Sequence, residues 1–278
     1  MNTAEFSALI FAGSCLAGFL GALTGLGGGV VIVPMLTMLF GVDIKYAIGA
    51  ALVSVIATSS GAAAAYVREG YSNVRVGMFL EIATTTGAIC GAIVAIYLRT
   101  SVIAVIFGVV LLYSAFLSYR QKPHAQSQVK TGKLAAWLQM DGSYPSANGL
   151  ESYHVRNVGG GFGLMYVAGV LSGLLGIGSG AVKVLAMDQV MKLPFKVSTT
   201  TSNFMIGVTA AASAGIYLSR GYVDPGLAMP VMLGVLAGSL LGARVLAISK
   251  VRVLRLVFAA VIAALAIEMI FNGLTKRI

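Results

Sequence analysis

The sequence predicts an all-α polytopic membrane protein built from two repeats that run in opposite directions through the bilayer. Hydrophobic residues make up 58% of the 278 residues and charged residues only 10%, whereas soluble domains carry roughly 25% charged residues. The mean hydropathy of +0.92 agrees with this contrast. In addition, two glycine-rich clusters interrupt apolar stretches at corresponding places in the two halves of the chain.

Eight apolar stretches approach or reach the length of about 20 residues that a spanning helix needs. They are Phe6–Leu23, Tyr46–Val67, Val76–Leu98 and Val102–Tyr119 in the first half, and Phe162–Leu175, Val197–Leu218, Leu227–Ile248 and Leu254–Phe271 in the second. The first stretch runs directly into more apolar sequence and has no small-residue cleavage site after it. We therefore expect a retained helix rather than a removed signal peptide.

A shift of 151 residues aligns the two halves. Between Ala17–Val31 and Ala168–Val182, eight of 15 positions are identical, and four of these are glycine. The same shift also pairs Lys45 with Lys196, Thr58 with Thr209, Tyr66 with Tyr217, Gly70-Tyr71 with Gly221-Tyr222, and Gly87 with Gly238. A register that stays constant over about 75 residues indicates an internal duplication.

Each half is expected to hold a glycine-interrupted segment followed by three spanning helices. The piece after the first interruption, Val30–Phe40, would form about half a bilayer of helix. As a returning limb or a short steep helix, it gives each half an odd number of crossings and inverts the second half. One continuous kinked helix would instead give parallel halves.

Loop charges distinguish these alternatives, because Lys and Arg are concentrated in cytoplasmic loops. Inversion places eleven cations on one side, which are Arg68, Arg75, Arg120, Lys122, Lys130, Lys133, Arg156, Lys192, Lys196, Lys250 and Arg252. It leaves five on the other, which are Lys45, Arg99, Arg220, Lys276 and Arg277. This division favours inversion in a bacterial inner membrane, with a cytoplasmic central connection and a periplasmic N-terminus.

The chain is thus divided into an N-terminal membrane repeat (1–119), a connecting loop (120–158) and a C-terminal membrane repeat (159–278). The loop is the only long polar stretch. Its turn-rich piece Asp141–Asn148 and the alternation after Glu151 predict a small β-hairpin. The loop is either a tether between the halves or a regulatory or subunit-contact module.

The glycine clusters are the main candidate binding site. Gly25, Gly27, Gly28 and Gly29 form the first cluster, and Gly176, Gly178, Ser179 and Gly180 form the second. Irregular backbone within a membrane is tolerated only where protein or a water-filled cavity surrounds it. A helix that begins after such a break directs free N–H groups and a positive dipole end toward an anion. Paired breaks in two repeats are typical of a transporter's binding site, and close helix packing through small residues is the alternative.

The stretch Gly21–Leu36 (GALTGLGGGVVIVPML) resembles the signature of the TauE/SafE family of sulfite and organosulfonate exporters, and Gly173–Val184 resembles its second half. The resemblance covers residues 5–119 and 159–272. Ser179 replaces a glycine, and Leu185 stands where the first half has Pro34. The resemblance implies a secondary transporter that exports sulfite, sulfoacetate or a related sulfur anion. The departures leave the particular anion open.

Several polar residues in apolar stretches are further candidates for anion binding. At helical spacing Thr199, Ser202 and Asn203 share one face and offer hydroxyl and amide donors, although such residues also cap helices or bond to the preceding turn. Thr58 is a candidate for polar lining from the first half. Because the equivalent of the second-half cluster, Ala47–Leu52, lacks hydroxyls, we expect an asymmetric site.

Charged residues within the apolar stretches are expensive in a bilayer and point to function. Lys183 follows the second glycine cluster and is expected to face a cavity, a partner or the anion. An ion pair with Asp188 has an awkward helical spacing, and Lys192 suits Asp188 better. Glu81 and Glu268 are candidates for proton coupling, although both lie near enough to a span end for ordinary interfacial exposure.

The sequence predicts neither an enzyme nor a cofactor or metal site. It has no phosphate-binding loop, GxSxG or HExxH motif, and its two cysteines lack CxxC spacing. The net charge of +10 is spread over loops, which argues against nucleic acid. The expected partners are a small anion and the lipid bilayer, with a homodimer as an open alternative. A non-transporting membrane scaffold that acts through its central loop and a channel are the competing functions.

Overall fold

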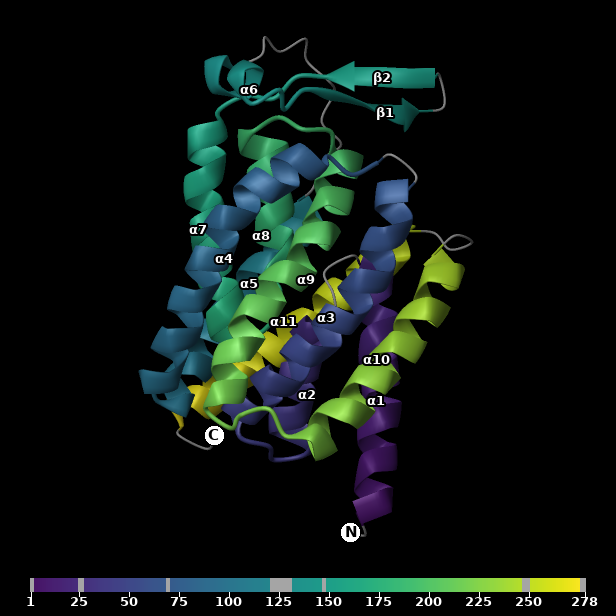
Figure 1. The fold of residues 1–278 in the computed structure, drawn as a ribbon. Coiled ribbons are helices and arrows are strands. Elements are labelled where there is room, and N and C mark those ends of the chain that lie inside the picture. The colour runs from purple at the N-terminus through teal and green to yellow at the C-terminus, as the bar shows by residue number, and fades with distance from the viewer. Residues whose placement is uncertain are drawn as a thin grey trace.

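A computed structural model describes residues 3–24, 28–68, 71–120, 132–146, 149–246 and 251–275. Most of these residues are helical (Figure 1). The helices of the first half are α1 (Thr3–Thr24), α2 (Gly29–Leu39), α3 (Ile44–Arg68), α4 (Val74–Tyr97) and α5 (Thr100–Arg120). The second half holds α7 (Val158–Leu175), α8 (Gly180–Leu185), the π-helix η1 (Ala186–Val190), α9 (Phe195–Ser219), α10 (Pro225–Leu246) and α11 (Val251–Leu274). The apolar stretches of the sequence therefore correspond to helices.

The predicted hairpin is present in the central connection. After the short helix α6 (Lys133–Trp137), β1 (Gly142–Ser146) pairs antiparallel with β2 (Gly149–Tyr153), with Gly142 opposite Tyr153 and Ser146 opposite Gly149. From its turn residues, Asp141–Asn148 was expected to form the turn of the hairpin, but β1 occupies most of this piece. Strand pairing with the Gly149–Tyr153 segment overrides the local turn preference of Asp, Gly, Ser and Pro.

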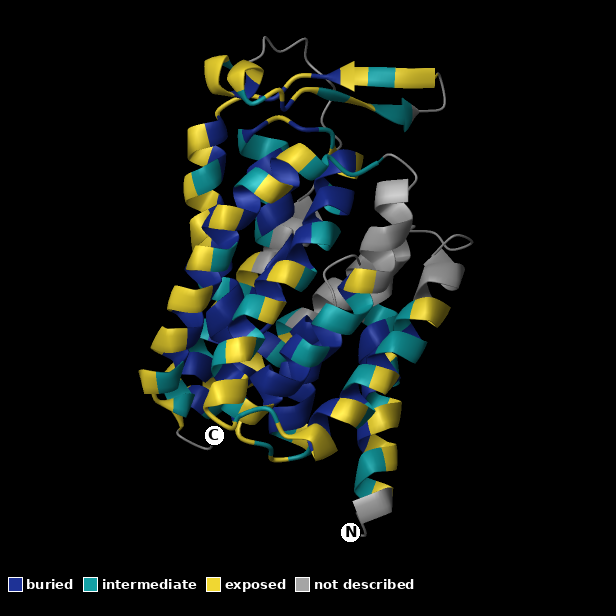
Figure 2. Ribbon diagram, in the orientation of Figure 1, coloured by how far each residue is buried: buried dark blue, intermediate teal, exposed yellow. Residues whose placement is uncertain are grey.

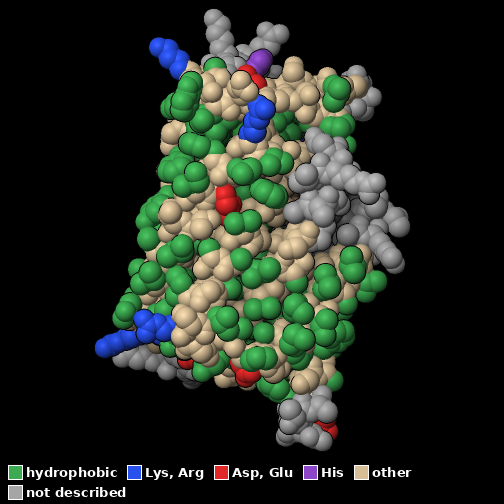
Figure 3. Space-filling view, in the orientation of Figure 1, with side chains coloured by type: hydrophobic (Ala, Val, Ile, Leu, Met, Phe, Trp, Pro, Cys, Tyr) green, Lys and Arg blue, Asp and Glu red, His purple; other side chains and the backbone are tan. Residues whose placement is uncertain are grey.

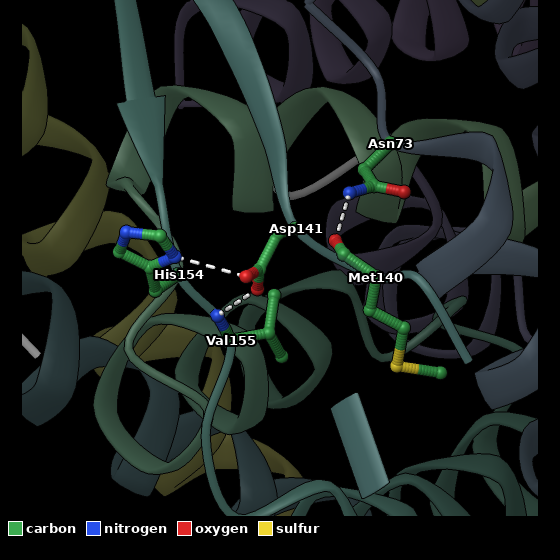
Figure 4. Close-up of polar contacts among 5 residues, drawn as sticks. All are labelled: Asn73, Met140, Asp141, His154 and Val155. Atoms are coloured by element: carbon green, nitrogen blue, oxygen red, sulfur yellow. Dashed lines mark hydrogen bonds and ion pairs between the residues drawn. The ribbon is translucent and has the colours of Figure 1, made fainter. Parts of the chain in front are cut away.

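Asn73 attaches the hairpin to the helices (Figure 4). Its Oδ1 accepts from Val76 N at 3.0 Å and so caps α4. Its Nδ2 donates to the carbonyl oxygen of Met140 and to the Tyr153 hydroxyl, each at 2.8 Å. Beside this contact, Asp141 accepts from Val155 N at 2.8 Å and lies 2.9 Å from His154 Nδ1. Burial raises the pKa of the Tyr153 hydroxyl above its ordinary value, because a phenolate would lose its contact with water there.

The helices of the two halves pair across the repeat boundary. Helix α1 packs against α10 as its equivalent α7 packs against α4, and α3·α10 mirrors α9·α4. The two remaining large contacts, α3·α9 and α5·α11, join equivalent helices. In Figure 1, α1 starts at the end of the molecule opposite the hairpin, whereas α7 starts at the hairpin end. The halves are interlocked rather than placed side by side as separate domains.

Glycines permit the closest of these crossings. A Cβ at Gly169 of α7 would collide with the Thr84 carbonyl of α4, and the equivalent Gly18 of α1 meets the Val235 carbonyl of α10. Residue 235 is the repeat equivalent of Thr84, so the two crossings use matching positions. Small residues let helix backbones approach closely in a membrane, and here the approach leaves no room for a side chain.

Apolar side chains cover much of the outer surface. Leu16 is 67% exposed, Ile82 60% and Ile267 62%, whereas buried residues fill the centre of the bundle (Figure 2). Figure 3 shows Lys and Arg at the two ends of one face and mainly hydrophobic side chains between them. Among the described residues, α4 and α7 have the length and hydropathy of a complete span. This distribution suits a lipid environment rather than water.

Candidate functional site

The second glycine cluster breaks the helix that enters it. Helix α7 ends at Leu175, and Gly176, Gly178 and Ser179 follow with φ of +68°, +69° and +43°. Glycine adopts this left-handed backbone readily, but a residue with a Cβ does so only at a cost in strain. Ser179 is buried, and its hydroxyl donates to the Ala168 carbonyl at 2.6 Å. This bond ties the break back onto α7 before α8 begins at Gly180.

The first cluster lies between α1, which ends at Thr24, and α2, which begins at Gly29. Gly25 and Gly27 lie outside the described residues. A Cβ at Gly29 would be 3.0 Å from the Gly176 carbonyl oxygen and 3.4 Å from Ile177 Cα. Gly28 and Gly29 are buried. The ends of the two interruptions, 147 residues apart from Gly29 to Gly176, therefore meet inside the bundle.

A buried polar network lies next to the second break. Lys183, in the first turn of α8, is fully buried, and its Nζ donates to Thr209 Oγ1 of α9 at 2.6 Å. Thr209 Oγ1 lies 2.6 Å from Glu81 Oε1 of α4 and donates to it. Glu81, which is 8% exposed, also accepts from Thr85 Oγ1 at 3.1 Å. One cation and one carboxylate from opposite halves are thus connected through a hydroxyl, and we call these three residues the Lys183–Thr209–Glu81 network.

The network places two ionisable side chains, Lys183 and Glu81, in the interior, where an unpaired charge is unfavourable. A buried ion pair is tolerated when its atoms are well bonded, and an unpaired buried charge is strongly destabilising. Within the described structure, Glu81 Oε2 is buried and has no hydrogen-bond partner. Glu81 therefore has one oxygen that belongs to the network and one that is free to take a proton or a water molecule. The network can therefore change its charge by taking up a proton.

Helix α9 positions the network against the break. Ile206 contacts Gly178 and Gly180 with its side chain, and Ser202 Oγ donates to the Gly180 carbonyl at 3.3 Å. Ser202, Ile206 and Thr209 are three and four residues apart, so they lie on one face of α9. This face of α9 therefore contacts both the second break and Lys183.

The three hydroxyl and amide candidates of α9 have different surroundings. Ser202 is buried at the break, whereas Thr199 and Asn203 are only partly buried. The Thr199 hydroxyl donates to the Phe195 carbonyl at 2.9 Å, one turn earlier. Their common face predicted from spacing therefore does not give them a common contact. Two neighbours have long-range roles instead: Thr200 Oγ1 donates to the Tyr71 carbonyl, and Thr201 Oγ1 accepts from Asn73 N.

Two other candidates lie apart from the network. Thr58 is partly buried, and its hydroxyl bonds the Ser54 and Val55 carbonyls of its own helix at 3.0 and 3.2 Å. Glu268 is exposed on α11. Asp188 accepts from Gln189 at 2.7 Å, while Lys192 is exposed with φ +62°. The carboxylate connected to Lys183, through Thr209, is therefore Glu81 rather than Asp188. Sequence spacing alone did not suggest this pair.

The repeat-equivalent positions do not hold a second copy of this network. By the shift of 151 residues, Lys183 corresponds to Ile32, Glu81 to Met232, and Thr209 to Thr58. Ile32 is fully buried. The two halves therefore differ at these positions in charged residues as well as in the hydroxyls noted in the sequence, and the asymmetric binding site stays a prediction.

A cavity near the central connection was not anticipated from the sequence. It has a volume of about 610 Å³ and is lined by Arg156, Asn157, Gln189, Val190 and Lys192. Two of these residues are cationic and two carry amides. The cavity opens where α7 begins and η1 ends, on the hairpin side of the molecule. The loop charges had placed Arg156 and Lys192 on the same side of the membrane. That they line one cavity is visible only in the folded structure.

These features define a multi-pass helical membrane transporter: interlocked halves, an apolar outer surface, and a buried charged network beside paired chain breaks. The family model for the sulfite exporter TauE/SafE matches residues 10–269, and the chain belongs to this family. Membership agrees with the resemblance drawn from the Gly21–Leu36 motif.

Curated relatives carry transporter names. The chain is similar to the probable membrane transporter protein YunE of Bacillus subtilis, with 28% identity over 93% of this chain and 95% of that protein. It is also similar to the probable membrane transporter protein YdhB of the same organism, with 25% identity over 82% and 84% of the two chains. A third relative is the probable membrane transporter protein MJ0441 of Methanocaldococcus jannaschii, with 23% identity over 92% of each chain. No solved structure matches the chain.

Proposed function

We propose that this transporter carries a small sulfur-containing oxyanion, such as sulfite or an organosulfonate, out of the cell across the bacterial inner membrane. The observation that carries the proposal is the fully buried Lys183 in the first turn of α8, directly after the second break. A buried cation attracts an anion far more strongly than an exposed one, because little water screens it.

The two breaks add neutral donors to this cation. The first turns of α2 and α8 have N–H groups without a helical partner, and the positive ends of their dipoles favour an anion. Neighbouring groups pack against the backbone at Gly28, Gly29, Gly176, Gly178 and Gly180 in this conformation. We propose that an oxyanion reaches this backbone when the two halves move apart, and we include Gly25 and Gly27 in the same role. The hydroxyls of Ser179 and Ser202 donate to backbone carbonyls here, and we propose that they turn to the anion when it binds. Thr199, Asn203 and Thr58 are proposed to line the path rather than to hold the cargo.

Alternating access follows from inverted repeats that rock against each other around a fixed site. The swapped helix pairs and the opposite starting ends of α1 and α7 support this arrangement. The excess of Lys and Arg around the central connection supports a cytoplasmic hairpin. The cavity at Arg156 and Lys192 would then be a basic vestibule through which an anion approaches from the cytoplasm.

Binding is tested first with purified wild-type protein in detergent. Thermal unfolding is measured with sulfite, sulfate, thiosulfate, sulfoacetate and taurine, and with chloride as a control. A ligand at about a hundred times its Kd stabilises the protein by about 2.7 kcal/mol, so at least one sulfur oxyanion should raise Tm. Lys183→Met should abolish the increase, and Lys133→Met, which removes an exposed cation of α6, should retain it.

Transport is then measured in proteoliposomes with the anion that binds. We expect saturable counterflow of labelled anion, which a channel does not give, and loss of counterflow in Lys183→Met. Asn203→Ala should reduce the rate by less. Counterflow that is unchanged in Lys183→Met would move the binding site away from the second break. An absence of any anion-dependent Tm change and of any flux would refute the oxyanion proposal.

A further inference from the structure

We propose that the transported anion and a proton bind this site together, with the proton on Glu81. This inference rests on the proposed function, because it assigns a coupling role to the same site. The Lys183–Thr209–Glu81 network commits the charge of Lys183 to a carboxylate from the other half of the chain. Cargo and carboxylate therefore compete for one cation.

The geometry makes Thr209 the connection between the two charges. A hydroxyl has a single proton, and Thr209 Oγ1 accepts from Lys183 Nζ while it donates to Glu81 Oε1 or to the Met205 carbonyl, which is 2.8 Å away. When Glu81 is protonated, its demand for that proton falls and Thr209 can donate to Met205 alone. Lys183 is then free to turn toward an anion at the break without leaving a buried carboxylate unpaired.

Charge balance in the buried site leads to the same conclusion. With Lys183 charged and Glu81 ionised, the network is neutral, and an added monoanion would leave a net charge of −1 in a medium where such a charge is expensive. One proton on Glu81 restores neutrality. The proton comes from water on the side to which the site is open and returns to water on the other side, and no bond other than O–H forms or breaks. The buried, unpartnered Oε2 of Glu81 is the atom that takes it.

Few other titratable groups face Glu81. Helix α7, which packs against α4, contains Tyr166 but no Asp, Glu, Lys, Arg or His. Helix α9 contains Lys196, which lies over the Tyr71 ring, and Tyr217, whose hydroxyl donates to the Gly173 carbonyl. On α4 itself, Arg75 bonds Gln139 of the central connection. Within the described residues, Lys183 is thus the cation that faces Glu81, so one proton is expected for each anion.

Among the described residues the network occurs once, which sets the expected stoichiometry. The repeat-equivalent positions hold Ile32 and Thr58 in the first half and Met232 in the second, and neither Ile32 nor Met232 can carry a proton or a charge. A transporter with one such network would bind one proton together with each anion in a transport cycle. Net movement of cargo then follows the sum of the anion and proton gradients.

The test measures binding of methanesulfonate, which remains a monoanion throughout the pH range, to purified protein between pH 5 and about pH 9. If the inference is right, wild-type affinity falls about tenfold for each pH unit above the titration of Glu81, and binding takes up one proton when measured with a pH indicator in weak buffer. At the acidic end of this range, where Lys183 stays charged, Glu81→Gln should bind with affinity that is independent of pH and with no proton uptake, because glutamine is neutral at every pH. Glu268→Gln is the matched control and should behave like the wild type.

Thr209→Ser and Thr209→Val test the connection and guard against misfolding of the charge variants. The serine variant keeps the hydroxyl and should retain proton uptake, whereas the valine variant should lose at least half of it while still unfolding cooperatively. Binding by the wild type without pH dependence, or proton uptake that persists in Glu81→Gln, would overturn the coupling and leave the anion site standing. If no anion binds at any pH, the proposed function fails, and the coupling fails with it.

Discussion

The Nζ atom of Lys196 lies 3.9 Å from the centre of the Tyr71 ring, and the repeat-equivalent pair, Lys45 and Tyr222, lies at 5.6 Å. Each contact joins a helix of one half to the loop that follows the equivalent helix of the other. The sequence alignment pairs Lys45 with Lys196 and Tyr71 with Tyr222. A cation at a span entrance, which on its own would suggest simple snorkelling, is therefore a contact between the two repeats.

The shorter of these contacts should be the stronger. Replacement of Tyr71 by Leu removes a cation–π interaction of about 0.5–1 kcal/mol. The cation–π coupling of Lys45 with Tyr222 should be smaller, because Lys45 also donates to the Ile96 carbonyl at 2.8 Å, although Tyr222→Leu also removes ring contacts with Tyr46 and Tyr217. The measurement is thermal unfolding in detergent. A double-mutant cycle with Lys196→Met isolates the pair, and a coupling energy of zero between Tyr71 and Lys196 would contradict the prediction.

Gly169 should tolerate no side chain. In Gly169→Ala the Cβ would collide with the Thr84 carbonyl, so α7 and α4 must separate, and overpacking of this kind costs about 1–3 kcal/mol. Gly163 on the same helix is the control, because nothing lies within 4 Å of a Cβ placed there. Gly163→Ala should stabilise the protein by up to about 1 kcal/mol through helix propensity. Equal effects of the two substitutions on Tm would show that the α4–α7 crossing is looser than described.

Asn73→Asp separates capping of α4 from attachment of the hairpin. Aspartate caps a helix as well as asparagine, but it has no N–H to donate to the Met140 carbonyl, and this lost hydrogen bond costs about 1 kcal/mol. The Tyr153 hydroxyl can still donate to the carboxylate. Hydrogen exchange should therefore accelerate in residues 142–153 and remain slow at the start of α4. Asn73→Ala should accelerate exchange in both. Unchanged exchange in the hairpin of the aspartate variant would mean that other contacts hold it.

Orientation can be measured with single cysteines. In a Cys15→Ala, Cys90→Ala background, an impermeant thiol reagent added to intact cells should label Ser219→Cys, near the end of α9, and spare Ser143→Cys in the hairpin. Both positions are exposed, so labelling reports the side of the membrane. After cell lysis both should react. Labelling of Ser143→Cys in intact cells would place the central connection outside and reverse the proposed topology.

The positions of the helices could be predicted from the sequence, because apolar stretches are local signals and the internal repeat places them at matching positions in the two halves. Val76–Leu98 and α4 agree within two residues, and the eleven-residue piece after the first glycine cluster became α2 with a shift of one residue. The glycine interruptions were also readable, since Gly176 and Gly178 adopt backbone angles that other residues avoid.

The site was predicted less completely because its contacts are distant in the chain. Lys183, Thr209 and Glu81 were each recognisable as unusual or matched, but 102 residues separate Glu81 from Lys183, and helical spacing points to neighbours on the same helix. Asp188 was therefore the available partner in sequence, whereas packing of α4 against α9 supplies the actual one. In the same way, Thr200 and Thr201 stand among similar hydroxyls, and only tertiary structure selects them to hold Tyr71 and Asn73.

Thr58 already stands at the position equivalent to Thr209, while Ile32 and Met232 replace the two ionisable members of the trio. Ile32→Lys combined with Met232→Glu would thus recreate the whole set in the opposite copy. Either change alone would strand an uncompensated charge in the apolar interior. Two substitutions would therefore make the three positions equivalent in the two halves. A library of paired replacements at 32 and 232 would show whether a transporter with two ionised networks still completes its transport cycle.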